Sequence, residues 1–281
     1  MTTPNNPFTT NAADSAYSRR RFLQTGGLAL ASAAILAACG KNLKVADAFP
    51  RIGESPTTTG LPDGEPTDIV LLRTASSLEF CAVDAYTAAL GLGLLPAAAT
   101  SVVKRFQSDH KAHAAAISEI VKKAGGEPFE CANERINTLY IAPAIELITG
   151  NKDKGIEASD TPVDDLIVLA HGLENLAAAT YQYYVSLLSQ PTLRSAAMGI
   201  GQEEARHAAV LAQVIIPDGK GIAPSVNETT GKPNPAAVPS AFGSLAAVSV
   251  ALGKPNASGN KTSLSFDTPS LNSMAYEYAA C

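Results

Sequence analysis

The sequence of 281 residues lacks several features that would place it in common protein classes. Its four cysteines are too few for a disulfide-stapled scaffold. Lys and Arg total 21 against 26 for Asp and Glu, so there is no basic excess and nucleic acid is not expected as a partner. No apolar run of about 18 residues follows the N-terminal segment, so the body of the chain is not expected to span a membrane.

The composition is that of a globular protein. Hydrophobic residues make up 46% of the chain and charged residues 17%, which is too apolar and too weakly charged for a disordered chain. The length allows one large domain or two small ones.

The N-terminus has the pattern of an export signal. Residues 18–24, SRRRFLQ, resemble a twin-arginine motif, and residues 28–38 are apolar and lead into Cys39 through small side chains. We therefore expect 1–38 to be removed, Cys39 to carry a lipid anchor, and 39–66 to form a flexible tether on the extracytoplasmic face of a bacterial membrane. The alternatives are an ordinary N-terminal helix, or cleavage without lipidation.

Helical periodicity dominates the body of the chain, and each long stretch ends near Pro or Gly. The four long helical stretches cover residues 67–95, 97–124, 161–190 and 192–216. An insertion at 127–160 contains a shorter helical stretch at 133–148. The Pro-, Gly- and Ser-rich residues 217–281 have no helical period and predict an irregular extension that wraps the bundle.

The two pairs of long helices are copies of each other. In the first helix of each pair, Glu79 and Tyr86 match Glu174 and Tyr181, which lie 95 residues later. In the second helix, DHKAHAA at 109–115 matches EEARHAA at 203–209, 94 residues later. Each second helix thus carries a pair of residues three apart that ends in His, and residues three apart share one helix face.

One Glu on each of two helices, with Glu-x-x-His on the others, resembles the ferritin-like superfamily, in particular exported bacterial ferritin-like domain proteins. The resemblance covers roughly residues 67–216 and implies an all-α antiparallel four-helix bundle with a long crossover between the second and third helices. It also implies two metal ions, iron or manganese. The implied ligands are Glu79, His113, Glu174, Glu204 and His207.

His110 departs from the family pattern, because the family has at this position the Glu that bridges the two metals. We expect His110 to point inward and to meet the other five residues at mid-bundle. A centre with an extra imidazole, a single metal ion, or a site that has lost its metal are all consistent with this substitution.

Several neighbours of these residues have two interpretations. Tyr86 and Tyr181 either donate hydrogen bonds to the glutamates or are plain core aromatics. His171, one turn before Glu174, is either a ligand or its supporting neighbour, or else a surface or capping residue. Asp109 and Glu203 are expected to face solvent.

Three cysteines remain if Cys39 is lipidated, and they allow three pairings. An exported protein can form disulfides. We predict a bond between Cys131, in the insertion, and Cys281, the last residue, which would tie the tail to the bundle.

Two functions fit these residues. One is a di-metal oxidoreductase of the peroxidase, catalase or oxidase kind, with dioxygen or peroxide as its small-molecule oxidant. The chain has no C-x-x-C pair for a rubredoxin-type iron. The other is a non-catalytic envelope protein that binds metal or protects against stress, with a degenerate site.

Overall fold

The computed structural model describes residues 65–216, 247–267, 269 and 271–281. The expected leader at 1–38, the lipidation at Cys39 and nearly all of the expected tether at 39–66 lie outside the described residues. Within those ranges, no helix is long and apolar enough to cross a membrane.

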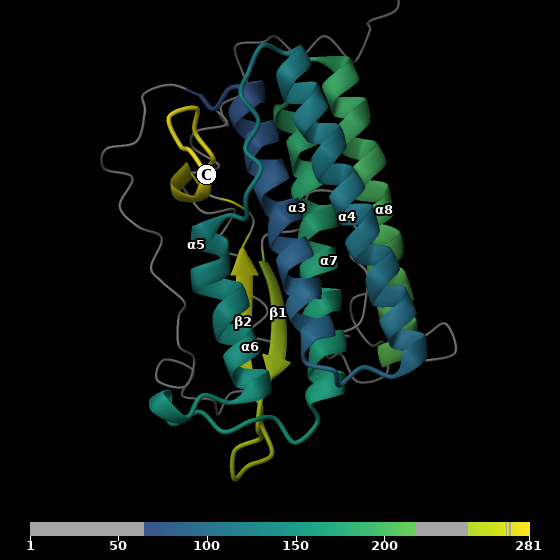
Figure 1. Cartoon of the computed structure of the whole chain (residues 1–281), viewed down its shortest axis with the longest axis vertical. Helices are drawn as coiled ribbons and strands as arrows, with labels where there is room; N and C mark the ends of the chain where they lie inside the picture. Colours follow the sequence, from purple (N-terminus) through teal and green to yellow (C-terminus); the bar gives the residue numbers. More distant parts are fainter. Residues whose placement is uncertain (1–64, 217–246, 268, 270) are drawn as a thin grey trace, which may run out of the picture.

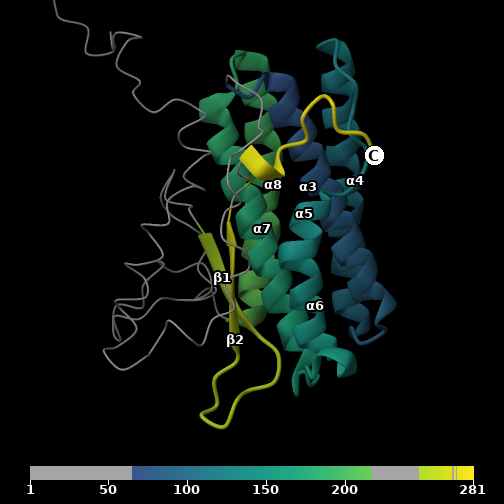
Figure 2. The same ribbon diagram turned by 90° about the vertical axis from the view of Figure 1, so that its left-hand side faces the viewer.

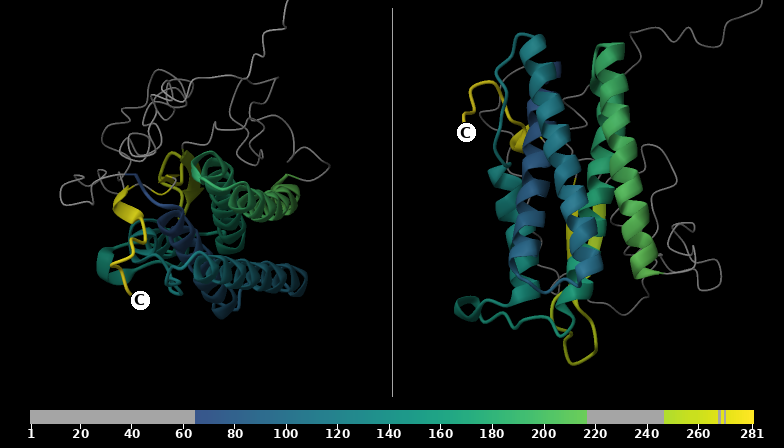
Figure 3. Two further views of the ribbon diagram at one scale, coloured as in Figure 1. Left: turned by 90° about the horizontal axis from the view of Figure 1, so that it is seen from above. Right: turned by 45° about the vertical axis from the view of Figure 1, so that its right-hand side comes forward.

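Four long helices form an antiparallel bundle, as predicted (Figure 1). They are α3 (Asp68–Gly91), α4 (Ala97–Lys123), α7 (Pro162–Leu187) and α8 (Pro191–Ile215). α3 packs chiefly on α4, and α7 packs chiefly on α8, so each sequence repeat is one helical hairpin (Figure 3).

The crossover between the two hairpins runs the length of the bundle and contains its own helices. It carries α5 (Glu134–Ile136), a π-helical turn (Asn137–Ile141) and α6 (Ala142–Thr149), which lie beside α3 and α7 (Figures 1 and 2). These three elements together occupy the stretch predicted as one helix at 133–148.

Local sequence explains the boundaries of the long helices. The Thr67 hydroxyl accepts a hydrogen bond of 3.2 Å from the Val70 N–H and so caps α3. Pro162 and Pro191 occupy the first turns of α7 and α8, where a missing N–H has no cost. α4 ends just before Gly125, whose φ of 83° favours glycine.

The C-terminal segment differs from the prediction, since it is not irregular throughout. Strands β1 (Ala247–Leu252) and β2 (Thr262–Asp267) form an antiparallel hairpin that packs on α7 (Figure 2). Val250 pairs with Leu264, and both are buried. Apolar and small residues alternate over the six positions of β1, which gives the strand its buried face. The alternation is short and lies among Gly and Pro residues, so the sequence alone did not indicate a strand here.

Two features attach the β-hairpin to α7. The absence of a side chain at Gly172 lets Val250 approach closely, because a Cβ there would lie 2.6 Å from a Val250 methyl group. The buried carboxylate of Asp165 accepts a hydrogen bond of 2.7 Å from the Gly253 N–H and forms an ion pair with Lys261.

The chain's last residues are attached to the N-terminal half of α3. The buried Arg73 guanidinium donates hydrogen bonds to the carbonyls of Ala275 and Tyr276, both at 3.1 Å, and of Ala279 at 2.6 Å. Cys131 and Cys281 form a disulfide bond, the pairing expected from the sequence.

We predict that replacing both Cys131 and Cys281 by Ser lowers the free energy of unfolding by about 2–4 kcal/mol, because the bond restricts the unfolded chain. Urea denaturation of the purified protein measures this difference. Dithiothreitol should lower the stability of the wild-type protein to the same extent and leave the double variant unchanged. An equal loss in both proteins would contradict the prediction.

Candidate metal centre

The six residues proposed from the sequence meet in the middle of the bundle. Each of the four long helices contributes at least one of them, and every one is at most 7% exposed. They are Glu79 from α3, His110 and His113 from α4, Glu174 from α7, and Glu204 and His207 from α8.

These side chains form two overlapping groups whose ligand atoms lie within 4.8 Å of one another. The first group is Glu79, His110, His113 and Glu204, and the second is His110, Glu174, Glu204 and His207. His110 and Glu204 belong to both groups. The arrangement can therefore hold one ion in each group, with two shared residues between them.

The ring of His110 spans the two groups. Its Nδ1 lies 2.8 Å from Glu79 Oε2, and its Nε2 lies 3.1 Å from Glu174 Oε1. The inward orientation expected for His110 is thus present in the structure. The imidazole of His110 thus lies at the position that the two groups share, opposite Glu204, and each of its ring nitrogens faces a different glutamate.

Each tyrosine contacts the glutamate of the other repeat. Tyr86 donates a hydrogen bond to Glu174, and Tyr181 donates one to Glu79. Because α3 and α7 run antiparallel, the seven-residue spacing within each helix brings the tyrosine of one opposite the glutamate of the other. Of the two interpretations, the structure therefore supports the hydrogen-bonding one.

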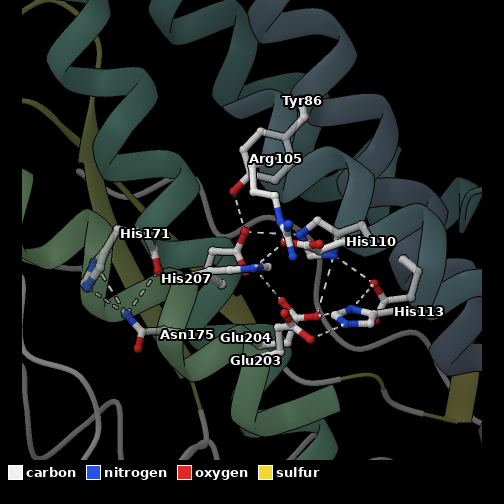
Figure 4. Close-up of polar contacts among 12 residues, drawn as sticks. Tyr86, Arg105, His110, His113, His171, Asn175, Glu203, Glu204 and His207 are labelled. Atoms are coloured by element: carbon white, nitrogen blue, oxygen red, sulfur yellow. Dashed lines mark hydrogen bonds and ion pairs between the residues drawn. The ribbon is translucent and has the colours of Figure 1, made fainter. Parts of the chain in front are cut away.

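Asp109 and Glu203 do not simply face solvent, which corrects the expectation from the sequence. Asp109 Oδ2 lies 3.4 Å from His207 Nε2, and Glu203 Oε2 lies 3.3 Å from His113 Nε2 (Figure 4). A signal was present in the sequence, because both repeats have an acid directly before the pair. Such outer carboxylates orient the ring and fix its tautomer.

The other nitrogen of each of these rings faces the cluster. His113 Nδ1 lies 2.9 Å from Glu204 Oε1, and His207 Nδ1 lies 3.2 Å from Glu174 Oε2. The His207 ring is also stacked on Phe106, with centroids 4.0 Å apart. Both histidines thus present Nδ1 to the centre.

His171 lies apart from the six residues, beside Asn175 on another side of α7 (Figure 4). Its Nε2 is 3.0 Å from the Asn175 side-chain nitrogen. The side chain is 3% exposed, so a surface position is wrong. The expected role as a ligand or its supporting neighbour is not supported by this placement.

Charge balance within the buried cluster shifts the pKa values of its members. Burial alone would raise the pKa of Glu79, but His110 and His113 lower it to about 2. Burial would lower the pKa values of His113 and His207, but neighbouring glutamates raise them to about 10 and about 9. Burial, with the charges of Glu79 and Glu174, raises the pKa of Glu204 to about 7.

Glu204 is the residue that most clearly fits a cation. It is 0% exposed, and its oxygens face three histidine nitrogens, with His113 Nδ1 at 2.9 Å, His207 Nδ1 at 3.5 Å and His110 Nδ1 at 3.6 Å. A buried carboxylate needs such cationic partners, and a metal ion bound by the same side chains could replace the protons on the histidines.

Comparison with known proteins agrees with this geometry. A family model of the ferritin-like domain matches residues 67–217, which is more than half of the chain. The chain belongs to this family. No curated protein and no solved structure gives a significant match. In this ferritin-like domain, the matched region is the four-helix bundle with its crossover, and the buried Glu/His groups within it can hold a metal ion.

We predict that the metal-free protein loses stability as the pH rises from about 6.5 to 10. Above the ordinary histidine pKa of about 6.5, the folded protein keeps protons on His113 and His207 that the unfolded chain has lost. Their contribution is therefore complete below pH 6.5 and is lost as the pH passes through about 9 and about 10. Melting temperatures of chelator-treated protein across this range measure the effect.

The double variant His113→Gln/His207→Gln is the control for this measurement, and its melting temperature should depend less on pH. On the acid side, Glu79 stabilises the fold above the ordinary glutamate pKa of about 4.3, and this contribution is lost as the pH falls towards about 2. A wild-type melting temperature that rises between pH 6.5 and 10 without metal would contradict the prediction.

Proposed function

We propose that this ferritin-like domain holds two metal ions, iron or manganese, at the mid-bundle cluster and uses them in oxygen or peroxide chemistry. The observation that carries the proposal is the buried Glu204 carboxylate, which belongs to both ligand groups and faces a histidine nitrogen of each. Mixed carboxylate and imidazole ligands suit iron and manganese.

The chain's own residues would prepare the site for the ions. Tyr86 and Tyr181 fix one oxygen each of Glu174 and Glu79, which leaves the second oxygen of each carboxylate to face the centre. Asp109 and Glu203 face the outer nitrogens of the histidines. These carboxylates favour a proton on Nε2, so loss of the second ring proton on metal uptake would leave the inner Nδ1 to bind.

Bound iron or manganese would supply electrons for the reduction of dioxygen or peroxide by cycling between oxidation states. The protein's part is to keep the site out of bulk water, since the six residues are almost fully buried. The hydroxyl groups of Tyr86 and Tyr181 keep their protons, because burial and the adjacent glutamates raise their pKa values well above the ordinary range.

A second function, non-catalytic metal binding or stress protection, is favoured by one specific observation. The three glutamates are matched by three histidines, and His110 connects Glu79 to Glu174 directly. The cluster can thus neutralise itself without metal when its histidines are protonated. A site that is stable when empty suits a protein that takes up metal only at times.

The place of action follows from the N-terminal motifs, which predict twin-arginine export and a lipid anchor at Cys39. The Cys131–Cys281 disulfide supports this proposal, because such bonds persist in oxidising compartments outside the cytoplasm. Replacing Arg19 and Arg20 by Lys should block export, and Cys39→Ala should release the protein from membranes. Unchanged membrane fractionation of the Cys39 variant would count against the anchor.

We predict that anaerobic reconstitution with Fe(II) or Mn(II) gives up to two ions per chain, measured by elemental analysis and titration calorimetry. Glu204→Gln should remove both, because it belongs to both groups. Glu203→Gln should weaken binding by about 10- to 100-fold, as is typical of an outer carboxylate. His171→Gln, changed at a histidine apart from the cluster, should bind like the wild type.

Peroxide consumption by the reconstituted protein then separates the two functions. Turnover that disappears in Glu204→Gln supports the oxidoreductase, and metal binding without turnover supports the second function. Failure of the wild-type protein to bind either metal would refute both.

A further inference from the structure

One half of the bundle interior is hollow. A cavity of about 440 Å³ lies between the C-terminal half of α3, the N-terminal halves of α4 and α7, and the end of α8, with α6 on one side. Cavities of this size are typical of small-molecule sites. The other half of the bundle is filled by large buried side chains such as Tyr184, Leu71 and Ile117.

Small residues along its wall leave room for the cavity. Alanines line it from three helices, where the filled half has leucine, isoleucine or tyrosine. They are Ala82, Ala85 and Ala89 on α3, Ala98 and Ala99 on α4, and Ala170 and Ala177 on α7. An apolar void of this size is destabilising when empty and does not attract water, so an apolar occupant would stabilise the fold.

The cavity has a polar patch in its wall and an apolar mouth. Tyr86, His110 and Glu174 of the mid-bundle cluster form the polar patch. Val210 and Val214 on α8 line it as well, yet they are 44% and 56% exposed, so they mark where it opens to solvent. Exposed apolar side chains gathered at one opening are a feature of binding sites.

The extent of the cavity favours a long occupant. Its lining on α7 extends from Val163 to Thr180, which is about 26 Å of helix, so a volume of about 440 Å³ is spread over a considerable length. Apart from Tyr86, His110 and Glu174, the wall is almost wholly apolar, with no other described charged group. A single extended hydrocarbon chain fits this length and surface, whereas a compact ring system would leave most of the cavity empty.

We propose that this cavity binds one long acyl chain, with its methyl end innermost. Tyr86, His110 and Glu174 are already bonded to one another and offer a polar head group no free partner, whereas the mouth lets such a head remain hydrated. The proposal does not depend on metal binding, because the wall that contacts the chain belongs to the aliphatic half of the cavity.

The test uses the purified, delipidated and chelator-treated protein, with the fluorescent fatty acid cis-parinaric acid as the probe. We expect saturable binding of one probe per chain and displacement by palmitate. Ala85→Phe, which fills the cavity, should weaken probe binding at least tenfold. Ala115→Phe, the same change at an exposed position on α4, should have no effect.

A second variant covers the case in which Ala85→Phe fails to fold. Val214→Asp adds a charge at the exposed mouth, where it should not disturb folding. This variant should also weaken probe binding at least tenfold. Displacement by palmitate identifies a free fatty acid as the source of the chain, and displacement only by detergent-dispersed phospholipid identifies a lipid. No saturable binding, or equal binding by Ala85→Phe and Ala115→Phe, would overturn the proposal.

Because the assay is done without metal, its failure leaves the proposed metal function untouched. Conversely, a protein that binds the probe but takes up no iron or manganese would refute the metal function alone.

Discussion

The burial of three carboxylates in an apolar bundle is the constraint on which the rest of the centre depends. Glu79, Glu174 and Glu204 are each at most 2% exposed. Buried charges are strongly unfavourable unless they are paired and hydrogen-bonded. The three histidines of α4 and α8 meet this requirement when metal is absent, and cations would meet it when metal is present. Proton and metal therefore compete for the same positions, so metal uptake must release protons.

Sequence duplication explains why so many partners arrive at the correct distance. The approximate twofold axis relates α3 to α7 and α4 to α8, so each supporting contact occurs twice. Tyr86 serves Glu174 as Tyr181 serves Glu79, and the acid before each pair faces the histidine of the opposite repeat. Among the six cluster residues, the two repeats differ in type at the shared position, where His110 faces Glu204.

Much of this centre was predictable, because helical spacing and a repeat both leave marks in the sequence. The six inward residues follow from i, i+3 pairs in register, and the helix ends follow from Pro96, Gly125 and Pro191. Contacts between repeats were not predictable in the same way. That Asp109 reaches His207 depends on how closely α4 approaches α8, and periodicity within one helix contains no such information.

The errors in the sequence analysis have equally physical causes. The β-hairpin at 247–267 depends on the face that α7 presents at Gly172, so its stability comes from tertiary packing and not from local propensity. His171 shares a helix with Glu174, but the offset of about 60° between them turns it towards Asn175 and away from the cluster, whereas the same offset leaves Glu204 and His207 both facing the centre. Position on one turn was thus insufficient to place it in the cluster.

The two ends of the bundle differ in how their interiors are packed. At one end, Arg73, the Cys131–Cys281 bond and the large side chains around Tyr184 close the core and attach the tail. At the other end, alanines leave a cavity that runs from exposed valines to His110. Stability can be supplied by the closed end, so the open end can remain hollow without unfolding the protein. The charged cluster lies at the boundary between them, so that Tyr181 of the filled half bonds to it on one side and the cavity wall includes His110 and Glu174 on the other.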